Sequence, residues 1–425
     1  MVDISPFKAI TYTAKAGALR DLITQPYDKI DQTMQREYYA KSAYNYCRLI
    51  LPMEENKYEA ARQRIQNWLL EGILAKDMEP AFFISRQEFT HAGRRLSRTG
   101  IIAALRLYPY EEKTVFPHEI TYGEPKADRL NMLRTTQKNL EPIFLIYSDP
   151  ENTTTRFFAE ATKTPPTMEV EDPLGVKHSV WKITHPESIN LLRNALADKK
   201  LVITDGHHRY ESAIAYRDEI RKHSQWTEDS AFNFHMAYLV PVQDQGLVIL
   251  PTHRLLRNYA LTSDTLTALK RFFTITEIQP TAEAIATFLA AHKNENALAV
   301  YDGAKAHGIT LKNEAEAAAL LNANSQKETC LIDVVILHDI IFKHVMKIST
   351  LKMDENIIYA ETIQNAMTKV DSKQANIAFL VNPIKPETVW HIAQNGWRLP
   401  EKSTNFHPKP VSGLIMMDIA PNEKL

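Results

Sequence analysis

The chain has 425 residues, of which 44% are hydrophobic and 24% are charged, and its formal net charge is −1. This length predicts about two or three domains with sizeable cores, and the near-zero charge argues against a general nucleic-acid or anionic-membrane surface. Two distant cysteines, no secretory leader and no apolar run of membrane-spanning length favour a soluble protein of a reducing cytoplasm.

The first part of the chain alternates helical and extended patterns. A capping residue at Asp31 or Thr33 predicts a helix that runs to about Tyr46. The apolar run at residues 47–52 then favours a strand. Apolar residues at helical spacing predict an amphipathic helix over residues 58–73.

Two further strands, at residues 81–89 and 99–107, are expected to form a hairpin. Its turn carries Arg94, Arg95 and Arg98. We expect these arginines to be a solvated hairpin end, and a ligand-facing role is the alternative.

A loop dense in chemically capable side chains is predicted between His118 and Arg129. His118-Glu119 begins like the H-E-x-x-H motif of zinc proteases, but Tyr122 stands where the second histidine is required, so that motif fails. Beside a histidine, Glu119 is a candidate general base. In the competing interpretation Glu119 is solvated or paired with Lys126 or Arg129.

The strongest motif is an apolar run that ends in Asp205-Gly206-His207-His208-Arg209 and continues into an amphipathic helix. A strand, a tight turn and a helix N-terminus favour an anion, because unpaired N–H groups and the helix dipole act together. Arg209 is suited to clamp a phosphate, and either histidine to stabilise developing charge or shuttle a proton. Asp205 is suited to bind Mg²⁺ or to cap the helix. A plain cap followed by surface side chains, or a metal site, are the competing interpretations.

Glycine is scarce, with 12 residues in the chain. No G-x-G-x-x-G, Walker A or G-x-S-x-G sequence is present, so the familiar nucleotide and hydrolase folds lose support. Gly206 is therefore expected where backbone geometry requires it.

The second half of the chain continues the alternation of strands and helices, so we expect an α/β (α+β) fold throughout. Residues 150–173 are interpreted as an exposed polar connector. The boundary is placed within residues 224–235, which gives domains of 1–228 and 229–425. A long apolar helix is predicted from Leu331 to about Met346.

The C-terminal stretch is irregular but contains Trp397 and Phe406, which suggests that it packs. Lys402-Ser403-Thr404 and Lys409 are suited to neutralise phosphates. The tail is thus expected to fold back toward the site or to be an ordinary polar tail.

The segment from Thr204 to Glu211 closely resembles the D-G-H-H-R-Y-E signature of a broad prokaryotic family known as domain of unknown function 1015. Gln25 departs from the pattern, where a second proline is expected. Further matching pieces follow the family's order over nearly the entire chain: Pro26-Tyr27-Asp28, His118-Glu119 through Asp128-Arg129-Leu130, and Pro400-x-Lys402-Ser403-Thr404-x-Phe406-x-Pro408-Lys409.

The D-G-H-H-R element is also similar to the nucleotide-binding signature of the partition-protein (ParB) and sulfiredoxin superfamily, which includes free-serine kinases. The resemblance implies a ParB/sulfiredoxin-like nucleotide-binding core with a second α/β domain. It also implies ATP or ADP with its phosphates on the turn, Mg²⁺, and a glutamate that acts as base on the serine hydroxyl. We take Glu119 as that glutamate because it stands in the densest polar loop.

On this hypothesis the chain is a small-molecule kinase, a phosphotransferase with an alcohol group as acceptor and free L-serine as first candidate. Asp205, His207 and His208 join Glu119 as candidate catalytic residues, and Asp205 is the candidate Mg²⁺ ligand. The cofactor contacts are assigned to Asp205, Gly206, His207, His208, Arg209, Lys126, Arg129, Lys402, Ser403 and Lys409.

Two other functions remain as alternatives. One is a nucleotide-binding regulatory or switch protein of the ParB-like type. The other, a sulfiredoxin-like repair enzyme, needs a reactive cysteine, and neither Cys47 nor Cys330 lies in an activating motif. The expected partner is a small molecule, without nucleic acid or membrane, and a homodimer is left open.

Overall fold

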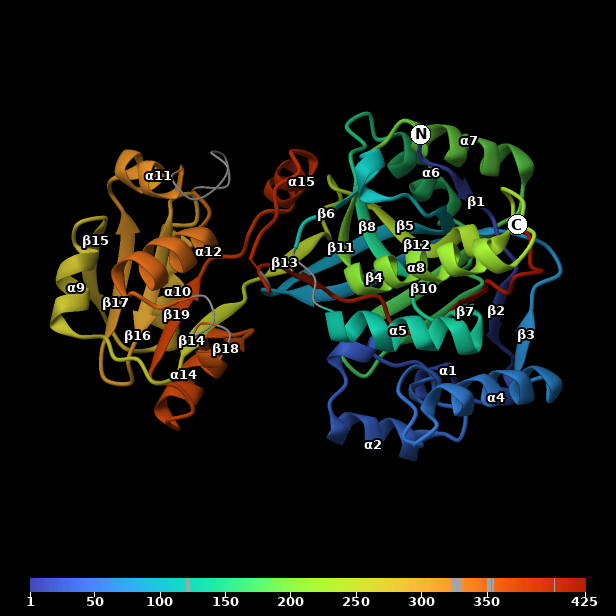
Figure 1. The fold of residues 1–425 in the computed structure, drawn as a ribbon, viewed down its shortest axis with the longest axis horizontal. Helices are drawn as coiled ribbons and strands as arrows, with labels where there is room; N and C mark the ends of the chain where they lie inside the picture. The colour runs from blue at the N-terminus through green and yellow to red at the C-terminus, as the bar shows by residue number, and fades with distance from the viewer. Residues whose placement is uncertain (120–122, 323–330, 350–352, 354, 401) are drawn as a thin grey trace. The chain divides into compact units, whose positions relative to one another are not determined.

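The chain divides into two compact units in a computed structural model that describes residues 1–119, 123–322, 331–349, 353, 355–400 and 402–425 (Figure 1). Unit 1 comprises Met1–Pro117, Thr121–Val248 and Pro408–Leu425. Unit 2 comprises His118–Ile120 and Ile249–His407. Each unit combines helices with sheets, so the expected mixed α/β fold class is confirmed.

The two units do not divide where the sequence places the domain boundary, between residues 228 and 229. β12 (Phe234–Pro241) belongs to unit 1, because it pairs antiparallel with β5 (Arg94–Arg106) and parallel with β8 (Ile143–Tyr147). The last 18 residues also belong to unit 1. The polar composition of residues 224–235 gives no sign of strand pairs that form with distant residues. That the two units are separate domains stays a prediction.

The main sheet of unit 1 has nine strands within the described residues, in the order β6-β11-β8-β12-β5-β4-β10-β9 with β1 beside β5. β11 pairs parallel with β6 and antiparallel with β8, and all five of its residues are buried. The strands not bounded above are β1 (Ile4–Ser5), β4 (Phe82–His91), β6 (Val115–Pro117), β9 (Met168–Glu171), β10 (Lys177–Ile183) and β11 (Leu201–Asp205).

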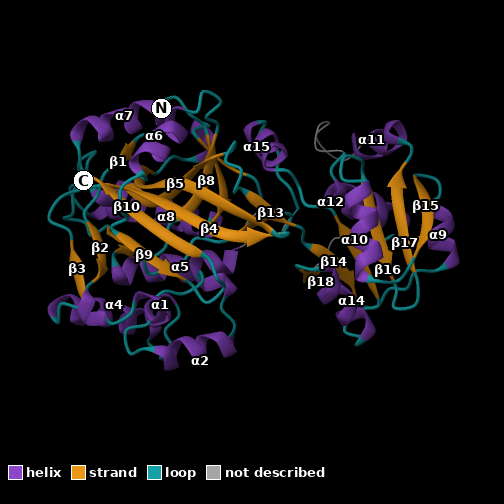
Figure 2. Ribbon diagram, turned by 180° about the vertical axis from the view of Figure 1, so that it is seen from behind, coloured by secondary structure: helices purple, strands orange, loops and turns teal. Residues whose placement is uncertain are grey.

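Two long helices cover one face of this sheet. α5 (Gly123–Thr136) and α8 (His207–His223) pack against each other, and they lie in front of the strands in Figure 1. The strands in turn lie in front of α8 when the molecule is seen from behind (Figure 2). The remaining helical segments here are α6 (Thr153–Ala161), α7 (Pro186–Ala197), η3 (Tyr110–Glu112) and η4 (Ala231–Asn233).

A smaller sheet of unit 1 brings the two ends of the chain together, in the order β3-β2-β21-β7. Its strands are β2 (Ala9–Tyr12), β3 (Leu74–Lys76), β7 (Lys138–Asn139) and β21 (Met416–Asp418). The helical segments around it are η1 (Ala14–Ala16), α1 (Leu19–Leu22), η2 (Tyr27–Lys29), α2 (Gln32–Lys41), α3 (Cys47–Ile50) and α4 (Lys57–Leu70).

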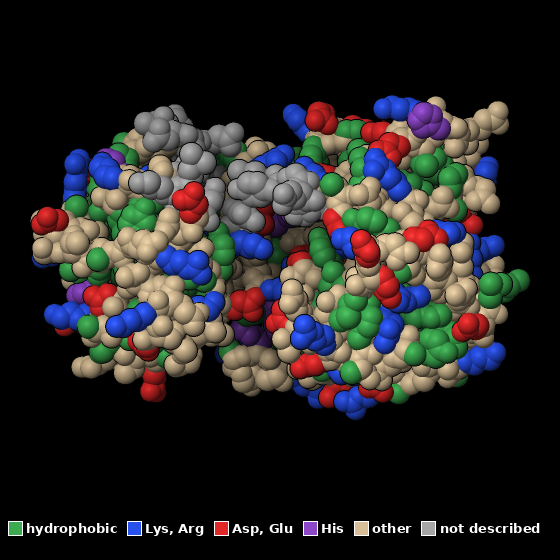
Figure 3. Space-filling model, turned by 60° about the horizontal axis from the view of Figure 1, so that its bottom comes forward, with side chains coloured by type: hydrophobic (Ala, Val, Ile, Leu, Met, Phe, Trp, Pro, Cys, Tyr) green, Lys and Arg blue, Asp and Glu red, His purple; other side chains and the backbone are tan. Residues whose placement is uncertain are grey.

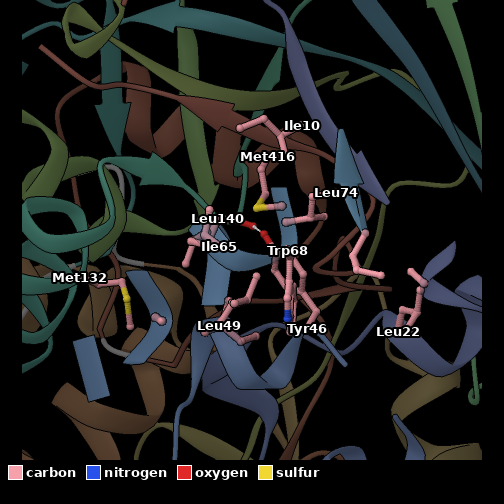
Figure 4. Close-up of a cluster of buried hydrophobic side chains, with 14 residues drawn as sticks. Ile10, Leu22, Tyr46, Leu49, Ile65, Trp68, Leu74, Met132, Leu140 and Met416 are labelled. Carbon is pink, nitrogen blue, oxygen red and sulfur yellow. Dashed lines mark hydrogen bonds between the residues drawn. The ribbon is translucent and has the colours of Figure 1, made fainter. Parts of the chain in front are cut away.

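An apolar cluster fastens this sheet to α4 and α5 (Figure 4). Tyr46 and Trp68 lie at its centre, and Met132 of α5 and Met416 of β21 join them. The Tyr46 hydroxyl donates a hydrogen bond to the Leu140 carbonyl at 2.6 Å. Each large apolar side chain buried in this way contributes roughly 1.5–3 kcal/mol. The cluster therefore fixes the C-terminal half of α5 and the chain just after it.

Unit 2 is built on a six-stranded sheet of described residues, in the order β15-β17-β16-β19-β14-β18. α10 and α14 pack together over a core that includes Ile285, Leu289, Met367 and Val370. The strands are β14 (His253–Leu256), β15 (Phe273–Ile278), β16 (Ala297–Tyr301), β17 (Ala306–Leu311), β18 (Ile357–Ala360) and β19 (Ile377–Val381), with β13 (Val248–Leu250) and β20 (Asn405–His407) as a separate pair. The helices are α9 (Ser263–Leu269), α10 (Ala282–Ala291), α11 (Glu314–Asn322), α12 (Asp333–Val335), α14 (Ile363–Asp371) and α15 (Pro386–Gln394).

The apolar helix predicted from Leu331 is present, but most of it is a π-helix, η5 (Ile336–Val345). The strand predicted at residues 47–52 is wrong, because Cys47–Ile50 forms α3. The Asn45 side chain accepts a hydrogen bond from the Cys47 amide at 2.9 Å and starts the turn. A short apolar run does not by itself distinguish a buried helix from a strand.

The predicted connector at residues 150–173 is also wrong, since it contains α6 and β9. The Asp149 carboxylate starts α6 by accepting hydrogen bonds from the amides of Thr153 and Thr154, and β9 pairs with β10. Within the part of the chain that the structure describes, every helix is too short or too polar to cross a bilayer. On the face shown in Figure 3, Lys and Arg are interspersed with Asp and Glu.

Candidate functional site

The predicted strand–turn–helix at Asp205 is present in unit 1. Buried β11 ends at Asp205, and α8 begins at His207. Gly206 between them has φ +89°, a backbone conformation that costs an L-residue about 1–2 kcal/mol. A Cβ atom on Gly206 would lie 2.9 Å from Nε of Arg209. Glycine is therefore required both by the turn and by the guanidinium that lies over it.

Two cations hold the Asp205 carboxylate. Nη2 of Arg209 lies 2.5 Å from Oδ2, and the Lys409 ammonium contacts Oδ1. Asp205 is buried, and its burial favours the neutral acid, but the charges of Lys409 and Arg209 outweigh that effect and lower the pKa of Asp205 to about 2. Asp205 is thus an anion that serves both cations, and Arg209 also contacts the Pro142 carbonyl.

Lys409 reaches the turn because its backbone is anchored in unit 1. The guanidinium of Arg98, which is 0% exposed, contacts the Pro408 carbonyl and the Gln87 side chain. Gln87 in turn donates a hydrogen bond to the Lys409 carbonyl at 3.1 Å. The prediction of a solvated end is correct for Arg94 and Arg95 and wrong for Arg98. Arg98 lies inside β5, beneath the C-terminal segment.

Two further motifs of the sequence meet beside the turn. Arg129 is buried, donates from Nε to Asp128 at 3.0 Å, and places its guanidinium 4.0 Å from the Tyr27 ring centroid. The Tyr27 amide donates to Glu141 at 3.1 Å. The loop predicted to run to Arg129 is wrong at its end, since Lys126, Asp128 and Arg129 lie within α5, and residues 120–122, including Tyr122, are outside the described part.

A small cavity with a volume of about 30 Å³ is lined by Arg209 and by both polar and apolar residues. Nε of Arg209 and Nδ2 of Asn139 are buried and have no hydrogen-bond partner among the described residues. Burial lowers the pKa of His235 to about 3, so that this imidazole is neutral. Polar residues that line the cavity include Arg129, Asn139, Glu141, Arg209 and His235.

The two histidines of the turn differ in exposure. His207 is buried and its charge helps to lower the pKa of Asp205, whereas His208 is partly exposed. Lys126 forms an ion pair with Glu211, one helical turn beyond His207. Unit 1 therefore holds eight of the predicted site residues: Lys126, Arg129, Asp205, Gly206, His207, His208, Arg209 and Lys409.

A carboxylate oxygen is the kind of donor that Mg²⁺ prefers, and Mg²⁺ is commonly held by one or two carboxylates together with phosphate and water. Asp205 does not fit such a role as it stands, because Lys409 contacts its Oδ1 and Arg209 its Oδ2. Among the residues that the structure describes, no group of three or more His, Cys, Asp or Glu side chains is arranged to hold a metal. Mg²⁺ at Asp205 stays a prediction.

The other predicted residues form a second polar cluster, in unit 2. Oε1 of Glu119 accepts hydrogen bonds from the Thr404 amide at 3.2 Å and from its hydroxyl at 3.0 Å. Nε2 of His118, a fully buried residue, lies 2.7 Å from the same hydroxyl. Thr404 thus joins His118 to Glu119, a role that sequence reasoning did not assign to it.

Lys402 and Ser403 are part of the same loop, and their contact with a phosphate stays a prediction. Ser403 is buried and donates its hydroxyl to the Pro400 carbonyl at 2.5 Å. Lys402 is exposed, and its carbonyl accepts a hydrogen bond from Arg254 at 3.1 Å. Arg254 is fully buried in β14, where burial lowers its pKa to about 10 against the opposing charge of Glu119. No local signal marks Arg254 in the sequence.

The cysteine required by a sulfiredoxin-like function is not activated at position 47. Burial raises the pKa of the Cys47 thiol to about 12. An activated cysteine needs the opposite shift. Cys330 lies outside the described residues.

A family model described as "Protein of unknown function (DUF1015)" matches residues 4–334. The comparison with curated proteins finds no match. Solved structures that match include a conserved hypothetical protein from Pyrococcus furiosus, at 12% identity and TM-score 0.34, covering 73% of this chain and 91% of that one.

Two other solved structures match this chain with similar identities and TM-scores. A mutant of a free serine kinase in complex with ADP matches at 11% identity and TM-score 0.36, covering 75% of this chain and 91% of that one. SbnI with C-terminal truncation from Staphylococcus aureus matches at 10% identity and TM-score 0.35, covering 74% of this chain and 87% of that one.

Proposed function

The chain belongs to the family of unknown function DUF1015, and we propose that it binds ATP or ADP at the Asp205–Arg209 turn and transfers a phosphoryl group to the hydroxyl of a small metabolite. Free L-serine is the first candidate acceptor, from the resemblance of the turn to the signature of free-serine kinases. The observation that carries the proposal is the combination of a helix N-terminus with Arg209 and Lys409.

This combination suits a phosphate for two physical reasons. The backbone N–H groups at the start of an α-helix point toward a ligand at its N-terminus, and the dipole of the 17-residue α8 favours an anion at that end. Arg209 and Lys409 bring two positive charges against the one negative charge of Asp205, which leaves one net positive charge. A phosphate oxygen at the turn therefore gains charge-assisted hydrogen bonds.

The proposed transfer follows from the chemistry of phosphoryl groups. The acceptor hydroxyl oxygen forms a bond to the terminal phosphorus, the bond from phosphorus to the bridging oxygen breaks, and the nucleotide leaves one phosphate shorter. The hydroxyl proton passes to a carboxylate base. Arg209 and Lys409 neutralise the charge that develops on the phosphate oxygens.

Glu119 is the proposed base. Thr404 donates two hydrogen bonds to a single oxygen of Glu119, which fixes the orientation of the carboxylate. Glu119 belongs to unit 2, and its part in the transfer is a proposal that mutation tests directly.

Phosphorus NMR of the full chain tests the proposal, with Mg²⁺, ATP or ADP and a pool of hydroxylated metabolites that includes serine. We expect a new phosphomonoester resonance that grows as the nucleotide signal falls. Arg209→Ala should abolish transfer and weaken nucleotide binding strongly. Glu119→Gln should abolish transfer and leave nucleotide binding nearly unchanged.

Arg94→Ala is the matched control, because Arg94 is an exposed arginine of unit 1 far along the hairpin from Arg98. It should retain both activities. Transfer that survives in Arg209→Ala would contradict the proposal. Tight nucleotide binding without a phosphoester would favour the alternative, a nucleotide-gated regulatory protein.

A further inference from the structure

His118 and Glu119 are bound to Leu399 and Thr404, two residues of unit 2 that lie far along the chain. The Leu399 amide donates a hydrogen bond to the His118 carbonyl at 2.8 Å, and Leu399 pairs with Glu119 as an isolated parallel bridge. The His118 ring is fully buried and packs edge-on against Phe406, with 6.2 Å between the ring centroids. The backbone register and the packing of the ring therefore hold the imidazole in place beside Glu119.

The hydroxyl of Thr404 has one hydrogen, and this fixes the direction of the hydrogen bonds around it. The hydroxyl donates that hydrogen to Oε1 of Glu119 at 3.0 Å. Nε2 of His118 lies 2.7 Å from the same hydroxyl oxygen, so the hydrogen of this second contact comes from Nε2. The donors thus follow the order His118, Thr404, Glu119. The order is the same for the neutral imidazole that carries its hydrogen on Nε2 and for the imidazolium.

His118 can act on Glu119 directly or through Thr404, and the distances decide between the two routes. Nε2 of His118 lies 3.5 Å from Oε1 of Glu119, which exceeds the usual N–H···O range of about 2.7–3.2 Å. The contact of Nε2 with Thr404, at 2.7 Å, lies within that range. Hydrogen bonds in a chain polarise one another, so the bond that His118 donates strengthens the bond that Thr404 donates. The route through Thr404 is therefore the effective one.

We propose that His118 is a positioning residue for Glu119 and acts through the hydroxyl of Thr404. This inference rests on the proposed function in that it takes Glu119 as the base. The hydrogen on Nε2 of His118 prevents the Thr404 hydroxyl from turning toward the imidazole, so its hydrogen stays on Glu119. The carboxylate then keeps one orientation as it receives the proton of the acceptor hydroxyl.

Nitrogen-15 NMR of the histidine-labelled full chain, without nucleotide, tests the order of the hydrogen bonds. Correlations between the ring nitrogens and the carbon-bound ring hydrogens distinguish a protonated Nε2 from an unprotonated one. The signals of His118 are identified by their loss in His118→Gln. We expect a hydrogen on Nε2 of His118 in the wild-type protein. An unprotonated Nε2 would overturn the inference, whether or not the chain transfers phosphoryl groups.

Steady-state kinetics test the positioning role. His118→Leu removes the donor and should lower kcat about three- to tenfold, the rate equivalent of one neutral hydrogen bond, with the KM for nucleotide unchanged. His118→Gln keeps an N–H donor of similar reach and should restore most of kcat. In a Thr404→Val background, His118→Leu should lower kcat no further, because the hydroxyl through which His118 acts is already gone.

His253→Leu is the matched control. His253 is another buried histidine of unit 2, and its Nδ1 accepts a hydrogen bond from the Val381 amide at 3.3 Å. Its replacement should leave kcat unchanged in the folded protein.

Two kinetic outcomes would overturn the inference: a wild-type kcat in His118→Leu, or an equal effect of His118→Leu with and without the Thr404 hydroxyl. Either outcome leaves the proposed function in place if Glu119→Gln abolishes transfer. A wild-type chain without transfer would instead contradict the proposed function, and the NMR result would still decide the order of the hydrogen bonds.

Discussion

The Asp205 cluster of unit 1 and the Glu119 cluster of unit 2 are two ways to hold a carboxylate. Asp205 is held by charge, with Lys409 on one oxygen and Arg209 on the other. Glu119 accepts hydrogen bonds from the hydroxyl and the amide of Thr404, which are neutral donors, and its Oε1 also lies 3.5 Å from Nε2 of His118. Both clusters take a partner from the same short stretch of chain, since Thr404 and Lys409 flank β20.

The difference predicts how each cluster responds to change. A buried ion pair that loses one partner leaves an uncompensated charge, which costs several kcal/mol. A neutral hydrogen bond that is lost leaves an unsatisfied polar group, which costs less. Asp205 should therefore be a strong determinant of the stability of unit 1, and the loss of a Thr404 hydrogen bond should cost unit 2 less.

Asp205→Asn should have the largest effect, because it leaves Arg209 and Lys409 without their counter-ion. We expect a loss of about 3–5 kcal/mol in the free energy of unfolding, measured with urea. Asp418→Asn is the control, since Asp418 also accepts two ammonium groups, from Lys76 at 3.1 Å and Lys138 at 2.8 Å, but is 16% exposed. Equal losses in free energy of unfolding for both variants would show that the deeper burial of Asp205 does not raise the cost of removing its charge.

Lowering the pH should have the second largest effect on stability. The folded-state pKa of His235 is lowered to about 3, so between pH 6.5 and that value the unfolded chain binds a proton that the folded chain does not. The stabilisation is complete above pH 6.5 and is lost as pH falls, by roughly 3 kcal/mol down to pH 4.

His235→Asn provides the comparison for this pH effect, because the amide can replace the imidazole as partner of the Met236 carbonyl. Urea unfolding at several values of pH should show a gap between wild type and variant that narrows toward pH 4. A gap that is constant with pH would contradict a neutral, buried His235.

Gly206→Ala should have the third largest effect on the free energy of unfolding. The positive φ and the approach of a Cβ to the Arg209 guanidinium together predict a loss of about 2 kcal/mol in the free energy of unfolding. Gly175→Ala separates the two causes, since Gly175 has φ +76° and a Cβ added there would have no other atom within 4 Å. It should cost about half as much. Equal losses would mean that crowding of Arg209 has no part in the effect.

Thr404→Val should have the smallest effect on stability, a loss of about 1–2 kcal/mol, because it removes the hydroxyl between His118 and Glu119. Thr404→Ser keeps the hydroxyl and should restore most of the stability. Hydrogen exchange should localise the loss to peptides of unit 2. A loss in free energy of unfolding as large for Thr404→Val as for Asp205→Asn would contradict the proposed difference between the two clusters.

The sequence predicted the structure best where the residues that determine a feature are close together in the chain. The buried run of β11, the positive φ of Gly206 and the start of α8 follow one another within a few residues, so their pattern predicts the turn. Sequence reasoning failed where burial depends on distant parts. Arg98 resembles its exposed neighbours Arg94 and Arg95, and its burial depends on Pro408, 310 residues away.

The sequence by itself determined the turn at Asp205, the mixed α/β class and the family, because strand, glycine and helix patterns act through neighbouring residues. Only the tertiary structure decided that Lys409 holds Asp205 and that Thr404 holds Glu119, across 204 and 285 residues. A charge or a hydroxyl finds its partner through the folding of the whole chain, and local sequence carries no record of which distant carboxylate it meets.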